Sequence, residues 1–139
     1  MLRIIGAIVA GTVSAFAVIW LIEAVGHVAF PLPEDLDLRD PELVAQALPS
    51  IPLPAKLIVV FAWFAGALSG GFVAGRIAGG RWTPWLVAAL VACGGIMTIL
   101  MIPHPVWMQI AAIVAPLLGG LGASHLAGVS HEEAGDARP

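Results

Sequence analysis

Charged residues are scarce in this chain, and their scarcity excludes a water-soluble fold. Only 11% of the 139 residues are charged, whereas 60% are hydrophobic. A soluble domain of this length could not bury so much apolar surface in a single core. A lipid bilayer can cover that surface, so the composition predicts an integral membrane protein with one domain.

Other absences each remove a class of function. The sequence has no run of Lys or Arg, so nucleic acid is not an expected partner. The single Cys93 lies in an apolar run, which excludes an intrachain disulfide and favours a small packing residue. No HExxH motif, paired CxxC motif or nucleophile arrangement occurs, so no catalytic residue is predicted. The sequence therefore favours a non-enzymatic protein.

Four long apolar runs predict four transmembrane helices, at about residues 4–30, 54–78, 83–102 and 106–127. Each run is close to the ~20 residues that a helix needs to cross a hydrocarbon core of about 30 Å. The runs lack the alternating pattern of a barrel wall, and lipid cannot satisfy an open backbone. The predicted fold is an all-α four-transmembrane-helix bundle at residues 1–128, followed by a polar cytoplasmic tail at residues 129–139.

The distribution of positive charge predicts the orientation. If all four runs span the membrane, four arginines share one side: Arg3, Arg76, Arg81 and Arg138. The other side carries two basic and five acidic residues: Arg39, Lys56, Glu34, Asp35, Asp37, Asp40 and Glu42. Because cytoplasmic segments carry the excess of positive charge, both termini are predicted to be cytoplasmic and the acidic loop 31–53 to face outward.

The outward loop is predicted to contain a short amphipathic helix. Asp40 suits an N-cap, Pro41 suits the first turn, and Glu42 is favoured by the helix dipole. The helix is expected to end before Pro49. It either lies on the membrane surface or caps the bundle.

Glycines form two stripes at the end of the second predicted span. Gly66 and Gly70 form one small-xxx-small step, and Gly71, Gly75 and Gly79 form a longer ladder. Small residues let helix backbones approach closely in a membrane. Two stripes predict a central helix with two neighbours, and the matching small residues lie in the first and fourth spans: Ala7, Gly11, Ala15, Gly119, Gly120 and Ala123. A contact between copies of the chain is the alternative interpretation.

Three ionisable residues are predicted to gather at the outer membrane face. Glu23 and His27 are four residues apart and share one helix face, and His104 lies in the tight link between the third and fourth spans. One hypothesis is a divalent-metal or proton site formed by these three residues. The other is structural: Glu23 accepts hydrogen bonds from the outer loop or from His104 and so pins that loop to the bundle.

Other polar residues have simpler expected roles. Arg76 and Arg81 are expected to anchor the inner face, where they could bind an anionic lipid head group. Gln109 is expected to make an interhelical hydrogen bond.

Three segments resemble a family of small, uncharacterised bacterial four-helix inner-membrane proteins. They are the string IEAVGH at 22–27, the FPLP that begins at Phe30, and IPHPVW at 102–107. The glycine-rich end of the second span is similar too, so the resemblance covers most of the chain up to about Ala127. It implies a four-helix fold in a bacterial inner membrane, and it implies no activity, cofactor or substrate.

Three functional hypotheses follow from these observations. The first is a non-enzymatic accessory or assembly subunit of a larger membrane complex. The second is a small oligomeric transporter or channel that uses Glu23, His27 and His104, although the middles of the spans hold almost no ionisable residue. The third is a membrane enzyme with an outer-face metal, which needs more ligands than the sequence offers.

Overall fold

The computed structural model describes residues 1–31, 37 and 39–136, with side chains up to Gly128. Its helices are α1 (Leu2–Ala29), α2 (Pro41–Ala47), a 3₁₀ turn η1 (Leu48–Ser50), α3 (Leu53–Ala78), α4 (Thr83–Met101) and α5 (Val106–Asp136). All of them except α2 and η1 are long and apolar enough to cross a membrane, α5 through its part Val106–Gly128. This confirms the predicted all-α, four-transmembrane-helix fold.

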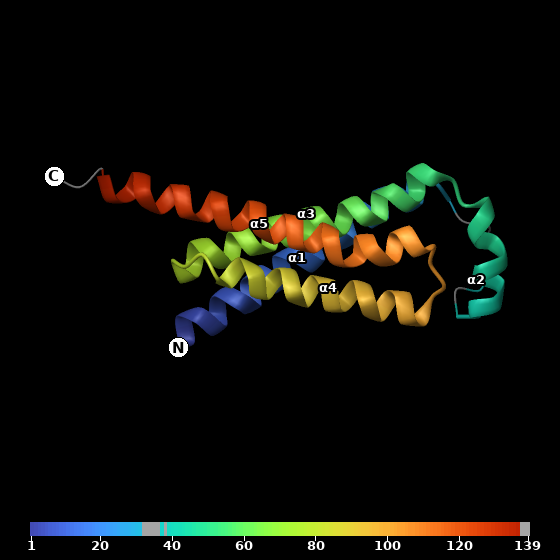
Figure 1. The fold of residues 1–139 in the computed structure, drawn as a ribbon, viewed down its shortest axis with the longest axis horizontal. Coiled ribbons are helices and arrows are strands. Elements are labelled where there is room, and N and C mark those ends of the chain that lie inside the picture. The colour runs from blue at the N-terminus through green and yellow to red at the C-terminus, as the bar shows by residue number, and fades with distance from the viewer. Residues whose placement is uncertain (32–36, 38, 137–139) are drawn as a thin grey trace.

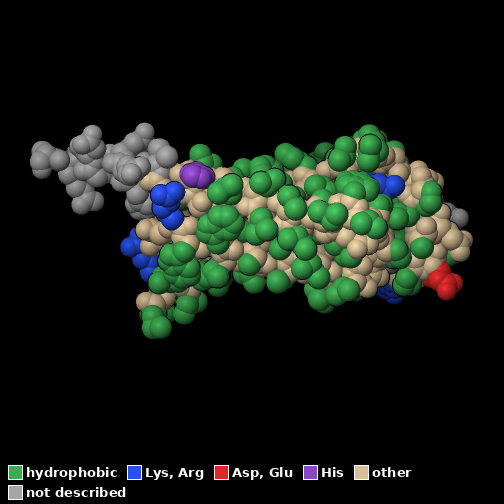
Figure 2. All heavy atoms as spheres, viewed as in Figure 1, with side chains coloured by type: hydrophobic (Ala, Val, Ile, Leu, Met, Phe, Trp, Pro, Cys, Tyr) green, Lys and Arg blue, Asp and Glu red, His purple; other side chains and the backbone are tan. Residues whose placement is uncertain are grey.

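The four long helices lie side by side, and the molecule has two distinct ends (Figure 1). One end holds the start of α1, the α3–α4 turn and the end of α5, and it carries Arg3, Arg76 and Arg81. We call it the arginine end. The other, the α2 end, holds α2 and the α4–α5 link. Figure 2 shows hydrophobic side chains along the length between the two ends, while charged side chains appear only near the ends of the face in view. Lipid can therefore cover the sides of the bundle.

Helix α5 extends further than the sequence predicts. The predicted span ends at about residue 127 and a polar tail is expected from residue 129; helix α5 continues through the first part of that tail to Asp136. Gly128 follows the apolar segment, but residues 129–136 contain no proline, and their Glu and Ala residues are good helix formers, which favours a continued helix. Residues 137–139, including Arg138, lie outside the described residues, as do Glu34 and Asp35 of the acidic loop.

Helix α2 begins as its sequence predicts. The Asp40 carboxylate accepts hydrogen bonds from the backbone N–H groups of Glu42, at 2.9 Å, and Leu43, at 3.4 Å. These N–H groups have no partner inside the helix, so the cap stabilises its first turn. The helix ends at Ala47, and the chain then forms the 3₁₀ turn around Pro49. The segment lies across the α2 end of the bundle (Figure 1).

Helix α3 is central and contacts α1, α4 and α5. Gly66 and Gly70 face α1: a Cβ added at Gly66 would lie 2.5 Å from a side-chain carbon of Ile19, and one added at Gly70 would collide with the backbone oxygen of Gly11. Because no side chain fits at these positions, glycine lets the two backbones come this close.

A second face of α3 carries Gly71 and Gly75 and meets α5. A Cβ added at Gly71 would lie 2.9 Å from the Cβ of Ala123, and one added at Gly75 would lie 2.7 Å from the Cβ of Ala127. Both glycine stripes are thus occupied by helices of the same chain.

Gly79 has a different role from the other glycines of its predicted ladder. It ends α3 in the left-handed conformation, with φ 73°, and its N–H donates to the backbone oxygen of Gly75. Glycine adopts this conformation without steric cost, which explains its place at the helix end. Gly79 is therefore a helix terminator and lies outside the packed stripe.

Helix α5 supplies two further close contacts. A Cβ added at Gly119 would lie 2.5 Å from the backbone oxygen of Phe64 on α3. One added at Gly120 would lie 2.6 Å from the Cβ of Ala88 on α4. Through these two glycines α5 approaches both neighbours.

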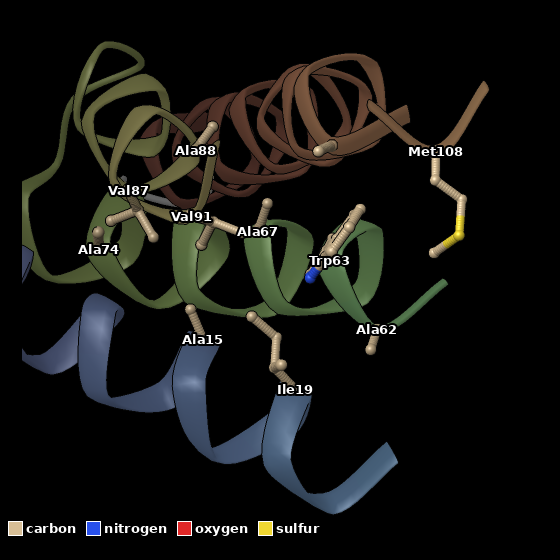
Figure 3. Packing of buried hydrophobic residues seen from close by; sticks show 11 residues of the cluster. Ala15, Ile19, Ala62, Trp63, Ala67, Ala74, Val87, Ala88, Val91 and Met108 are labelled. Carbon is tan, nitrogen blue, oxygen red and sulfur yellow. The ribbon is translucent and has the colours of Figure 1, made fainter. Parts of the chain in front are cut away.

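The core consists mainly of small side chains. Its largest fully buried side chains are Val87, Val91, Thr83, Pro84 and Pro116. Figure 3 shows alanines and valines between the helices, with one large aromatic residue, Trp63, among them. Close van der Waals contact between backbones therefore holds the helices together, as is typical of membrane bundles.

Candidate functional site

The structure ties both candidate histidines to nearby backbone. Nδ1 of His27 lies 2.8 Å from the backbone oxygen of Glu23, and Nδ1 of His104 lies 2.6 Å from that of Ile102. A carbonyl oxygen only accepts, so each Nδ1 carries the proton in these bonds. The orientation of each imidazole is thus set within its own segment.

These three candidates do not form one metal site. Among the side chains that the structure describes, no three His, Cys, Asp or Glu residues lie close enough to hold a metal ion. The physical reason is local: His27 bonds back to its own helix and His104 to its own link, so neither ring is held by the Glu23 carboxylate. The prediction of a shared metal site is therefore wrong for this part of the chain, while a proton-transfer role for Glu23 stays a hypothesis.

Glu23 instead lines a pocket of about 370 Å³ between α1, α3 and α4. We call it the Glu23 pocket. Its lining residues are Phe16, Ile19, Trp20, Glu23, Trp63, Val91, Gly94, Gly95 and Thr98. Among the described residues that line it, aromatic and aliphatic side chains predominate, and Glu23 is the one ionisable residue.

Different helix pairings flank the Glu23 pocket. Helix α1 follows α3 along its length, through Gly66 beside Ile19 and Gly26 beside Ile58. Helix α4 approaches α5 instead, where a Cβ added at Gly95 would lie 3.3 Å from that of Ala112. The pocket lies between α1 and α4, with Trp63 of α3 in its lining.

The polar groups of the pocket come from three helices. Glu23 lies six residues before the end of α1, which places it about 9 Å from that end. The Thr98 hydroxyl, on α4, donates to the backbone oxygen of Gly94 at 3.0 Å. In Figure 3 the indole nitrogen of Trp63 lies on the side of α1. Within the described part of the chain, the Glu23 carboxylate has neither a hydrogen bond nor an ion pair, although the His27 imidazole one turn further along α1 interacts with it electrostatically. Its oxygens can therefore still accept a ligand.

Gln109 differs from its predicted role. Its side-chain amide donates to the backbone oxygen of His104 at 2.9 Å. This bond holds the α4–α5 link against the first turn of α5, and it replaces the interhelical hydrogen bond expected from the sequence. The nearby carbonyl in the Pro-rich link is within reach because Gln109 lies only one turn into the helix.

The arginine end gathers three guanidinium groups. Nε of Arg3 donates to the backbone oxygen of Ile77 at 2.6 Å, which satisfies a carbonyl in the last turn of α3. Arg76 lies over the Phe72 ring, 5.5 Å from its centre, and Arg81 is exposed beside Gly128. None of the three is paired with a carboxylate in the part of the chain whose side chains are described. This arrangement suits an anionic head group at Arg76 and Arg81.

Comparison with protein families, with curated proteins and with solved structures finds no match to this chain. The resemblance to small bacterial four-helix membrane proteins thus stays a hypothesis.

The sequence analysis missed most of the Glu23 pocket. Trp63 was the available signal, because it lies ten residues into α3 and so about 15 Å along that helix, whereas tryptophans of membrane proteins gather at the interfaces. Phe16 and Thr98 carry no comparable signal, since an aromatic residue and a threonine are ordinary in a span.

Proposed function

We propose that this chain is a small non-enzymatic integral membrane protein that serves as an accessory or assembly subunit of a larger membrane complex. The observation that carries the proposal is the close packing of the bundle. At Gly11, Gly66, Gly71, Gly119 and Gly120, an added Cβ would come within 2.9 Å of a neighbouring helix. Helices this close at the glycine contacts favour a packed bundle over a wide water-filled channel within one chain.

The buried polar groups support the same proposal. In the described part of the chain, the buried polar residues are Thr83 and Ser124. Their hydroxyls donate to backbone oxygens of the same segment, those of Gly80 and Leu121. Because these two hydroxyls are satisfied by nearby backbone, neither offers an ion a free ligand between the helices. The remaining surface is suited to lipid and to other membrane proteins.

We propose a bacterial inner membrane as the location, with both termini in the cytoplasm, and membership in the family that the sequence resembles. The grouping of Arg3, Arg76 and Arg81 at one end supports this orientation, because cytoplasmic segments are rich in Lys and Arg. Anionic lipid of the cytoplasmic leaflet is the proposed ligand of Arg76 and Arg81.

The accessory role is tested by the composition of the native complex. Membranes from isotopically light cells that carry a tagged copy are mixed with heavy membranes from cells without the tag, and then extracted in mild detergent. We expect other polypeptides to copurify with the tagged chain at constant stoichiometry. They should carry only the light isotope, because partners that were bound before the membranes were mixed come from the same light cells as the tagged chain. Recovery of the tagged chain alone, or with partners that are equally light and heavy, would contradict the proposal.

Glu23 favours a second candidate, a small oligomeric transporter. An ionisable residue within a span is a reason to suspect transport, and Glu23 lines a pocket in the bundle. In proteoliposomes with a trapped pH-sensitive dye, this function predicts a proton flux that Glu23→Gln abolishes. Equal flux in the unmodified protein, the Glu23→Gln variant and empty liposomes would exclude it.

A further inference from the structure

The Glu23 pocket combines one carboxylate with several aromatic side chains. Phe16 and Trp20 on α1 and Trp63 on α3 line it together with Glu23. Aromatic faces attract cations through their quadrupole, most strongly when water is excluded, and organic ammonium groups are often recognised in this way. A carboxylate in a membrane span is costly unless an opposite charge is present, and His27, which interacts with Glu23 electrostatically, is not among the residues that line the pocket. Both features point to a positively charged occupant.

An inorganic cation does not suit this pocket. Mg²⁺ and Ca²⁺ need six or more oxygen ligands, counting waters. Among the described residues that line the pocket, the side chains of Glu23 and Thr98 alone carry oxygen, far fewer oxygens than such an ion needs from the protein unless water supplies most of its ligands. The other surfaces are aromatic, aliphatic or glycine. They match the apolar body of an organic cation.

The pocket is reached from the lipid side of the bundle. Trp20 is 71% exposed and Phe16 is 48% exposed, and both line the pocket from α1. A ligand entering past them must first dissolve in the membrane. No Lys or Arg is among the described residues that line the pocket, so a phospholipid head group would bring a phosphate with no countercharge from them.

We propose that the Glu23 pocket binds a lipophilic organic ammonium ion, with its charged nitrogen near the Glu23 carboxylate and its apolar groups against Phe16, Trp20 and Trp63. This site does not depend on the accessory role. Binding is measured on the isolated chain, whereas the accessory role is decided by the composition of the complex.

Equilibrium binding of radiolabelled tetrabutylammonium tests the proposal. The full-length protein is held in dodecyl maltoside micelles, which carry neither charge nor ammonium, at mildly alkaline pH. We expect saturable binding at one site per chain. Glu23→Gln should weaken it by about tenfold or more, because the variant keeps the shape and removes the charge. Trp63→Leu should weaken it several-fold.

Two matched variants serve as controls. Glu42→Gln removes a carboxylate from the exposed first turn of α2, and Ser69→Ala alters a second, apolar pocket lined by Val18, Leu68 and Phe72. Both should bind as the unmodified protein does. Circular dichroism melts of every variant identify any that fails to fold, and Glu23→Asp, which keeps the charge, should retain more binding than Glu23→Gln.

Three outcomes would overturn the proposal. The first is no saturable binding of tetrabutylammonium, and the second is equal affinity of the unmodified protein and the Glu23→Gln variant. The third is a loss of binding in Glu42→Gln as large as the loss in Glu23→Gln. Added phosphatidylethanolamine separates the two sources of an ammonium group. If it fails to compete with tetrabutylammonium, the free cation is supported. If it competes at stoichiometric amounts and copurifies only with chains that keep Glu23, a lipid head group occupies the site and the free cation is ruled out as the ligand.

Discussion

Replacing Gly70 with alanine is expected to destabilise the bundle by about 3 kcal/mol, the upper part of the usual range for overpacking. The new methyl group would collide with the backbone oxygen of Gly11 and would lie 2.6 Å from the Cβ of Ala15. A backbone atom cannot move aside as a flexible side chain can, so α1 would have to separate from α3. Unfolding in mixed micelles of increasing SDS content, followed by circular dichroism, measures the loss.

Gly6→Ala is the matched control for this prediction. Gly6 lies in the same helix pair, but nothing is found within 4 Å of a Cβ added there. Alanine is also the better helix former by up to about 1 kcal/mol in soluble peptides. The Gly6→Ala variant should therefore be as stable as the unmodified protein or slightly more stable. An equal loss of stability in both variants would show that the close approach of α1 and α3 is not the cause.

The contact between α4 and α5 allows a second test, in which one methyl group is moved across an interface. In a Gly120→Ala variant the new Cβ would lie 2.6 Å from that of Ala88, and the next nearest atom is 3.6 Å away. Ala88 is therefore the only close obstacle. We expect this variant to lose about 2 kcal/mol of stability.

Ala88→Gly should restore much of that loss when it is combined with Gly120→Ala, because the obstacle has been removed. By itself Ala88→Gly costs up to about 1 kcal/mol, through backbone entropy and a small void. The double-mutant cycle should thus give a favourable coupling of at least about 1 kcal/mol. Additive effects, within about 0.5 kcal/mol, would contradict the observed packing of α5 on α4.

The fold could be predicted because its main determinants are local. A helix that crosses a membrane needs a long apolar segment, and each of the four segments is visible in the sequence without reference to the others. The start of α2 is local too, since Asp40 caps the helix that immediately follows it. The glycine pattern of α3 also indicated a central helix, because Gly70 and Gly71 point toward different neighbours.

The site could be predicted only in part, because it depends on how separate helices pack. The spacing of Glu23 and His27 placed them on one helix face, but it could not show that the His27 ring bonds to the backbone oxygen of Glu23. Trp63 lines the pocket, and Gly66, one turn further along α3, lies against Ile19 of α1, which lines the same pocket. The pocket between α1 and α4 therefore depends on close contacts between separate helices.

Cysteine labelling in intact cells tests the central claim, that four spans place the α2 end and the arginine end on opposite sides of the membrane. In a Cys93→Ala background, single cysteines are introduced by Ser50→Cys, after α2, and by Leu2→Cys, where the side chain is 88% exposed at the start of α1. A membrane-impermeant maleimide should label the Ser50→Cys variant in intact cells and the Leu2→Cys variant only after permeabilisation. Labelling of both variants from the same side would contradict the account.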